Sequence, residues 1–237
     1  MATKDHQSEP IESASETLQR IFDGHGSVLG SQMADESSRY DVLKKTDFPK
    51  PKRTRRIAVA NQKGGVGKTT STVNTAAALA DKGAQVLVID MDPQGNASTA
   101  LGVSHASGEP SVYDVIEGRS DLGDVITVCP DFPTLDVVPA SIDLSGAELE
   151  VADLPNRNTL LKEALDLYLR QSDKHYDYVF IDCPPSLGLL VINAMCAVTE
   201  MLIPIQAEYY ALEGLGQLIN TIGLVQEHFN PVLLVST

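Results

Sequence analysis

The stretch ANQKGGVGKTT, residues 60–70, constrains the fold of this chain more than any other. A short, apolar, β-prone run precedes it at residues 57–60, and residues 69–82 carry apolar side chains at helical spacing. Glycines let backbone N–H groups turn inward around a phosphate, and a helix N-terminus adds free donors and partial positive charge. The order of strand, glycine loop and helix therefore predicts a phosphate-binding loop in an α/β domain.

Two side chains of this loop carry the expected chemistry. Lys68 would reach the β- and γ-phosphate oxygens of a nucleotide, and the Thr69 hydroxyl would ligate Mg²⁺. The usual pattern G-x-x-x-x-G-K-[ST] has glycine where this chain has Gln62, and Lys63 is an additional lysine. The predicted nucleotide-binding residues are Lys63, Gly64, Gly65, Val66, Gly67, Lys68, Thr69 and Thr70.

Two further apolar runs end in aspartate. The run VLVID ends at Asp90 and is followed by Met91 and Asp92, and the run YVFID ends at Asp182. In an open parallel sheet, ligands bind beyond the carboxyl ends of the strands, so these carboxylates should face the crevice that holds Lys68. Prolines at 184 and 185 lack N–H donors, which indicates that regular pairing stops after Asp182.

A group of carboxylates beside nucleotide phosphates implies a bound cation. We expect a Mg²⁺ site formed by Thr69, Asp90 and Asp182, with Asp90 and Asp182 acting through water. Asp92 would position or deprotonate the water that attacks the γ-phosphate. The predicted catalytic residues are therefore Lys63, Lys68 and Asp92, and the predicted substrate is ATP with Mg²⁺.

The remainder of the chain reads as alternating helices and strands. Amphipathic or capped stretches predict helices at 111–117, 144–151, 159–170, 186–196 and 212–229, with Ser186 as a cap. Apolar runs predict strands at 135–138, 201–205 and 232–235, and Pro204 suggests a sheet edge or a bulge. The fold expected is a doubly wound, mostly parallel α/β sheet.

The first 56 residues read as a flexible tail before a domain at 57–237. Residues 11–22 could form a short amphipathic helix, with Ser13 and Glu16 as a capping box and Gly24 at its end. The basic side chains at 50, 52, 53, 55 and 56 form either a solubilising linker or a contact for DNA or a partner.

Composition narrows the class of protein. Of the 18 basic and 32 acidic residues in the chain, eight basic and 23 acidic lie in residues 57–237, a surface that repels nucleic acid unless its cations gather on one face. No apolar run reaches the roughly 18 residues of a membrane span, and no secretory signal is evident. Cys129, Cys183 and Cys196 lack metal-ligand spacing. These features predict a cytoplasmic protein with reduced thiols.

Four segments taken in order resemble the ParA/Soj chromosome- and plasmid-partitioning ATPases. They are NQKGGVGKTT at 61–70, DMDPQGN at 90–96, IDCPPS at 181–186 and QAEYYALEG at 206–214. The resemblance implies a bacterial, nucleoid-associated ATPase with the deviant phosphate loop of this group. It also implies an ATP-dependent homodimer in which Lys63 touches the nucleotide of the other subunit. The implied partners are non-specific double-stranded DNA and a ParB-type centromere-binding protein that stimulates hydrolysis.

Several readings remain open beside this one. A MinD-like positioning ATPase has a similar loop but lacks the second and fourth segments, and the chain could also be a non-hydrolysing scaffold or a P-loop transferase acting on a small metabolite. Members of the partitioning family continue for about two more β/α units, so we expect the domain to be incomplete at its C-terminal edge, where DNA contacts should lie.

Overall fold

The computed structural model describes residues 28–46, 48–206 and 211–236, which belong to two compact units, Met1–Phe48 and Pro49–Thr237. In the first unit, α2 (Val28–Lys45) is an 18-residue helix. Its large apolar side chains at 33, 40, 42 and 43 are exposed. The sequence did not suggest this helix because its apolar residues follow no helical period. The helix predicted at 11–22 lies outside the described residues.

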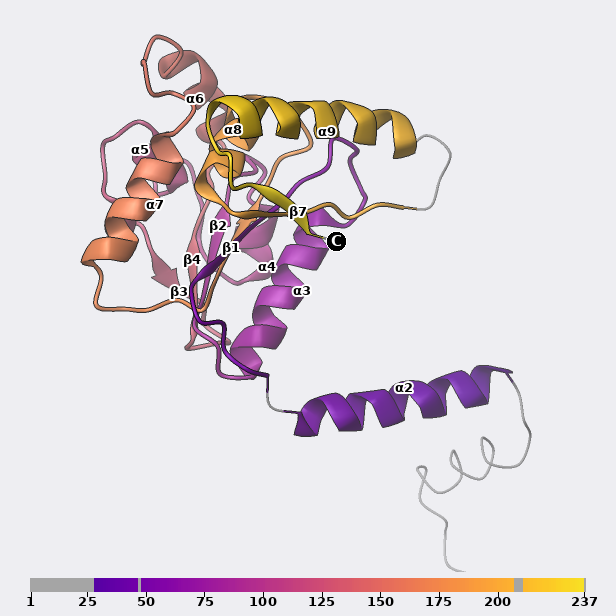
Figure 1. Cartoon of the computed structure of the whole chain (residues 1–237). Coiled ribbons are helices and arrows are strands. Elements are labelled where there is room, and N and C mark those ends of the chain that lie inside the picture. Colours follow the sequence, from indigo (N-terminus) through magenta and orange to yellow (C-terminus); the bar gives the residue numbers. More distant parts are fainter. Residues whose placement is uncertain (1–27, 47, 207–210, 237) are drawn as a thin grey trace, which may run out of the picture. The chain divides into compact units, whose positions relative to one another are not determined.

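The second unit contains a seven-stranded sheet in the order β3-β4-β2-β5-β1-β6-β7 (Figure 1). Neighbouring strands run parallel, apart from the antiparallel pair β3 and β4. The strands are β1 (Arg55–Val59), β2 (Val86–Asp90), β3 (Thr127–Val128), β4 (Leu135–Val138), β5 (Tyr178–Asp182), β6 (Glu200–Leu202) and β7 (Leu234–Ser236). The predicted doubly wound, mostly parallel sheet is confirmed.

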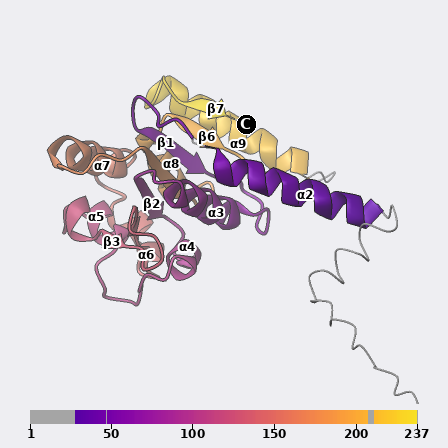
Figure 2. The ribbon, with the colours of Figure 1, turned by 90° about the horizontal axis from the view of Figure 1, so that it is seen from below.

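Helices cover both faces of this sheet, as alternating side chains on the strands require. They are α3 (Lys68–Asp81), α4 (Asn96–Ala100), α5 (Val112–Ile116), α6 (Leu144–Glu150), α7 (Leu160–Gln171), α8 (Leu189–Ala197) and α9 (Ala211–His228), together with a 3₁₀ turn at Leu122–Asp124. In Figure 2, β1 and β6 lie between α3 and α9.

Two buried clusters divide the core between the two faces. On one face, Ala76 and Ala80 of α3 pack with Val59 and Phe180. On the other face, the apolar sides of α5 to α9 pack on strand residues such as Leu87 and Ile181. Cys129, Cys183 and Cys196 are buried and form no disulfide. Because the phosphate loop directly follows β1, it lies at the carboxyl end of the parallel sheet.

The compact unit begins at Pro49 rather than at residue 57, and β1 begins at Arg55. Both basic residues at the start of β1 pair with β5 in the sheet. Their side chains form ion pairs, Arg55 with Glu200 at 2.6 Å and Arg56 with Asp166 at 2.5 Å. These two arginines therefore belong to the domain and not to a linker.

Other predicted boundaries also differ from the structure. Helix α8 begins at Leu189 after Gly188 and has no side-chain cap, so the cap predicted at Ser186 is wrong. Strand β6 stops at Leu202 and lies inside the sheet, so Pro204 marks neither an edge strand nor a bulge. The capped helix predicted at 111–117 is confirmed as α5, whose capping box joins Ser111 and Asp114.

Candidate functional site

The phosphate loop connects β1 to α3 and is held open by glycine geometry. Gly65 and Gly67 have φ angles of 73° and 91°, in the left-handed region that favours glycine. A Cβ atom at either position would meet no heavy atom within 4 Å, so the space beside the loop is open. Gly67 precedes the first turn of α3 and offers no side-chain cap, which leaves that turn's N–H groups available to an anion.

A cavity of about 520 Å³ opens beside this loop. The lining includes predicted binding residues of the loop and also Asp92, the predicted water-positioning residue. Three further lining residues were not singled out from the sequence, although all three stand in the two aspartate-bearing segments: Gln94, Asn96 and Pro185. The complete lining is Gly64, Gly65, Gly67, Lys68, Thr69, Thr70, Asp92, Gln94, Asn96 and Pro185.

Thr69 and Asp182 lie together, as the magnesium prediction requires. The Thr69 hydroxyl donates to Asp182 Oδ2 at 2.7 Å, and the Thr72 hydroxyl lies 3.0 Å from Asp182 Oδ1. The pKa of the Asp182 carboxyl is raised to about 7, chiefly by burial and also by the nearby Asp90 charge, although the hydrogen bonds from the two threonines act in the opposite direction. This carboxylate therefore lies where a cation would stabilise its charged form.

The donor set fits Mg²⁺ held partly by a nucleotide. Within the described part of the chain, no three or more His, Cys, Asp and Glu side chains form a group that could hold a metal ion. Mg²⁺ rarely uses an all-protein cage and commonly binds through one or two protein oxygens, phosphates and water. Thr69 lines the cavity and hydrogen-bonds the buried Asp182, so these two residues could supply the protein's share of the ligands.

Asp90 occupies a different position from the one predicted. It is fully buried and does not line the cavity. Its Oδ2 accepts from the Ser98 N–H at 2.8 Å and the Ser98 hydroxyl at 2.7 Å, and its Oδ1 accepts from the Asp92 N–H at 3.1 Å. Burial raises the pKa of Asp90, while these hydrogen bonds lower it. Asp90 thus shapes the turn that presents Asp92 to the cavity.

Lys63 does not line the phosphate cavity. Its ammonium Nζ lies 3.4 Å from Gln206 Oε1, in the segment that follows β6. Lys68 is 7% exposed, and its Nζ lies 3.3 Å from the Lys63 carbonyl oxygen. The two lysines of the loop therefore have different surroundings, one inside the cavity wall and one at the surface.

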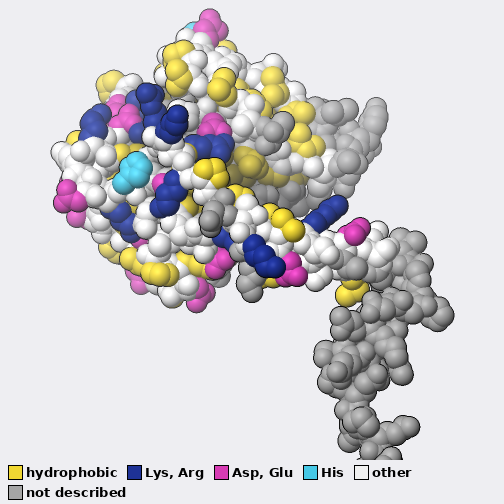
Figure 3. All heavy atoms as spheres, turned by 60° about the horizontal axis from the view of Figure 1, so that its bottom comes forward, with side chains coloured by type: hydrophobic (Ala, Val, Ile, Leu, Met, Phe, Trp, Pro, Cys, Tyr) yellow, Lys and Arg dark blue, Asp and Glu magenta, His cyan; other side chains and the backbone are white. Residues whose placement is uncertain are grey.

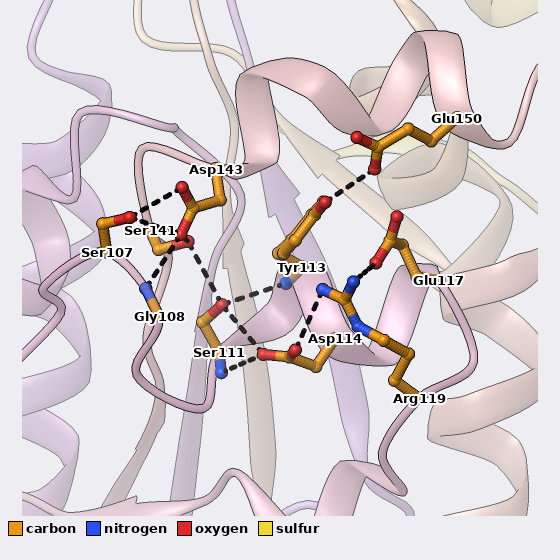
Figure 4. Close-up of polar contacts among 10 residues, drawn as sticks. All are labelled: Ser107, Gly108, Ser111, Tyr113, Asp114, Glu117, Arg119, Ser141, Asp143 and Glu150. Carbon is orange, nitrogen blue, oxygen red and sulfur yellow. Dashed lines mark hydrogen bonds and ion pairs between the residues drawn. The ribbon is translucent and has the colours of Figure 1, made fainter.

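Tyr113 and Arg119, whose role could not be assigned from the sequence, belong to a polar cluster that connects α5 with α6 (Figure 4). The Tyr113 hydroxyl donates to Glu150 Oε2 at 2.6 Å, and this bond raises the pKa of Tyr113 to about 12. The Arg119 guanidinium lies 4.5 Å from the centre of the Tyr113 ring and forms ion pairs with Asp114 and Glu117. These contacts stabilise the packing of α5 and α6.

The parallel sheet, the glycine loop and the threonine–aspartate pair together define a P-loop nucleotide-binding domain. A protein family described as "AAA domain" matches residues 54–235. The sporulation initiation inhibitor protein Soj of Bacillus subtilis is 51% identical over 179 residues, which are 76% of this chain and 69% of Soj. The chromosome partitioning protein ParA of Caulobacter vibrioides is 47% identical, with 75% and 65% covered. The chain belongs to the ParA/Soj family.

Solved structures agree with this fold. A structure described as cobyrinic acid a,c-diamide synthase from Mycobacterium smegmatis, with bound ADP and magnesium, superposes with a TM-score of 0.70 at 40% identity. It covers 77% of this chain and 72% of that protein. A plasmid partition protein from Borrelia burgdorferi superposes with a TM-score of 0.67 at 27% identity, covering 78% and 77%. The predicted family and P-loop fold are confirmed.

Proposed function

We propose that this chain is a Mg²⁺-dependent ATPase of the ParA type that acts in DNA segregation. The observation that carries the proposal is the Thr69–Asp182 pair beside a glycine-lined cavity, in a chain about half identical to Soj. The aligned residues span roughly two thirds of the length of the curated relatives. ADP and magnesium in the mycobacterial structure support the same choice of nucleotide and metal.

Each side chain in the cavity has a distinct part in the proposed hydrolysis. Lys68 neutralises charge on the β- and γ-phosphates, and the N–H groups of the loop and of α3 orient them. Thr69 and Asp182 would hold Mg²⁺, which would supply positive charge beside the phosphate oxygens. Asp92, whose Oδ1 accepts from the Gln94 N–H at 3.0 Å, orients the attacking water, and Asp90 fixes that turn from behind.

ATP binding would drive the formation of a homodimer with two nucleotides at the interface. Lys63 supports this part of the proposal because its ammonium lies outside the cavity of its own subunit. From there it would reach the nucleotide of the second subunit. The dimer would bind double-stranded DNA without sequence preference in the nucleoid, and a ParB-type partner would stimulate hydrolysis.

The test is ATP turnover by the purified chain with Mg²⁺, alone and with duplex DNA and the ParB-type protein of the same organism. We expect slow turnover that depends on Mg²⁺ and rises when both DNA and the partner are present. ATP turnover no faster than spontaneous hydrolysis in buffer, under every condition, would contradict the proposal and favour a non-hydrolysing scaffold.

A second candidate is ATP-dependent chemistry on a small metabolite. The description of the mycobacterial structure as a diamide synthase, at 40% identity, favours it. This activity would require that cobyrinic acid with an ammonia donor accelerates ATP consumption, whereas the ParA-type proposal expects no change. The same assay therefore separates the two candidates.

A further inference from the structure

Two side chains fasten the phosphate loop to the segment that follows β6. Asn61, which is 7% exposed, donates from Nδ2 to the Pro204 carbonyl at 2.8 Å, and its Oδ1 accepts from the Lys63 N–H at 3.0 Å. The Ala60 N–H donates to the Leu202 carbonyl at 3.2 Å. Ala60 and Asn61, at the start of the loop, are therefore hydrogen-bonded to Leu202 and Pro204.

Gln206 makes the outermost contact of this set. Its Nε2 donates to the Gly65 carbonyl at 3.2 Å, and its Oε1 lies 3.4 Å from Lys63 Nζ. A carboxamide suits this position because it offers one donor and one acceptor on the same planar group. A carboxylate could still accept from Lys63 but could not donate to Gly65, and an apolar side chain could do neither.

The Lys63 ammonium lies against Gln206 and not in the phosphate cavity of its own subunit. The cavity lining includes Gly64 and Lys68 on either side of the loop but not Lys63. Both partners of the Lys63–Gln206 contact lie at the surface, where a second molecule can reach them. A lysine that acts on the nucleotide of another subunit must leave this contact before it can do so.

We propose that Gln206 is a positioning residue that clamps Lys63 in the free subunit and releases it when the ATP-bound dimer forms. This inference rests on the cross-subunit role proposed for Lys63. The clamp holds the lysine ammonium at the surface. Because the same carboxamide also donates to the Gly65 carbonyl, a movement of the loop backbone at Gly65 would affect the contact with Lys63. Dimerisation therefore competes with a contact inside the subunit, which restrains pairing of free chains.

The first test measures the reactivity of Lys63 in the nucleotide-free chain. Limited amine acetylation followed by peptide mass spectrometry reports Lys63 and, as an internal reference, the exposed Lys52. Loss of one hydrogen bond of ordinary net strength should raise Lys63 labelling roughly two- to tenfold in Gln206→Met. Gln206→Glu keeps an acceptor and should restore protection, and Gln217→Met, an exposed glutamine of α9, should change nothing.

Equal Lys63 labelling in wild type, Gln206→Met and Gln206→Glu would overturn the clamp. Equal increases of Lys63 labelling in Gln206→Met and Gln206→Glu would indicate a merely structural role for Gln206 and would also overturn the clamp. Labelling needs neither nucleotide nor a second subunit, so it tests the clamp even where no dimer forms.

The second test measures release. In an Asp92→Ala background, which accumulates the ATP state, Gln206→Met should tighten ATP-dependent dimerisation by roughly two- to tenfold at saturating ATP. An unchanged or weaker dimer in Gln206→Met would overturn the release step. If Lys63 labelling responds as expected but no variant dimerises with ATP, the clamp stands and the proposed dimer switch fails.

Discussion

The residues of the cavity wall have separable tasks, and Lys68 has the simplest. It is the buried lysine of the loop, and its ammonium lies 3.3 Å from the Lys63 carbonyl oxygen. A bond between a charged group and a phosphate is worth about 1.5–3 kcal/mol, so Lys68→Ala should weaken ATP binding roughly 10- to 100-fold. Titration with a fluorescent ATP analogue measures this, and the surface variant Lys52→Ala should bind as wild type does.

Asp92 should separate binding from hydrolysis. It lines the same cavity as Lys68, and its backbone N–H is held by Asp90 Oδ1 at 3.1 Å. Positioned acid–base groups contribute roughly 10²- to 10⁴-fold to rate, so Asp92→Ala should bind ATP normally but hydrolyse it at least about 100-fold more slowly. Steady-state phosphate release measures the rate, and equal turnover in the variant and wild type would remove Asp92 from the mechanism.

Thr72 belongs to the support of the site rather than to its surface. Its buried hydroxyl lies 3.0 Å from both Asp182 Oδ1 and the Lys68 carbonyl. Thr72→Val keeps the shape but removes a donor from a buried carboxylate, which should lower the free energy of unfolding by about 1–3 kcal/mol. Urea denaturation measures the change. The exposed Thr75→Val in the same helix should cost far less, and equal losses in both would contradict this role.

Among the elements, the end of α8 is joined to the turn between α9 and β7 by the buried side chain of Asn230. Asn230 is 5% exposed and donates from Nδ2 to the carbonyls of Met195 at 2.8 Å and Val198 at 2.7 Å. Those carbonyls lie at the end of α8, where helical partners run out. Asn230→Ala should therefore lower the free energy of unfolding by about 1–3 kcal/mol in denaturant titrations. The exposed Asn220→Ala on α9 is the matched control and should show no such loss.

The elements that the sequence predicted well are those with a strong period or a clear cap. Strands β2 and β5 are short apolar runs between turn signals, and α7 shows apolar residues at helical spacing. By contrast, α4 has only five residues and follows a Pro–Gln–Gly turn, so no periodic signal marks it. Strand β3 has two exposed residues and depends on pairing with β4, which local sequence does not encode.

The candidate site, like the fold, was predicted only in part from the sequence. Lys68, Thr69 and Asp92 follow from motifs whose chemistry is local, and the structure brings them to one cavity. The role of Asp90 in holding Mg²⁺ through water stays a prediction, and its contact with Ser98 was not foreseen because the sequence did not predict α4. The sequence assigned no separate role to Gln206, which is the first residue of the segment at 206–214. Its contact with the loop spans 141 residues of sequence, so no local pattern reveals it.

At the scale of the whole molecule, charge is distributed unevenly. The chain carries a formal net charge of −14, and residues 57–237 hold eight basic and 23 acidic residues, while on the face that Figure 3 draws, Lys and Arg side chains are interspersed with Asp and Glu. Some of the chain's cations form ion pairs with buried carboxylates: Lys50 contacts Asp177 at 3.1 Å, and Lys174 contacts Asp136 at 2.5 Å. Within the described residues, no helix is long and apolar enough to cross a membrane.

Nucleotide binding should also be visible in the stability of the whole domain. A ligand that binds only the folded chain adds about 2.7 kcal/mol of stability at 100 times its Kd. Mg²⁺-ATP should therefore raise the thermal unfolding midpoint of wild type and of Asp92→Ala, with a much smaller effect in Lys68→Ala at the same concentration. Equal shifts in all three proteins would show that ATP binds elsewhere.

We expect ATP, and not ADP, to join two of these chains through the phosphate loop. Light scattering of the Asp92→Ala chain with Mg²⁺ and each nucleotide tests it most directly, because blocked hydrolysis should let the ATP form accumulate. We expect a dimer with ATP and a monomer with ADP. A folded monomer with both nucleotides would contradict it.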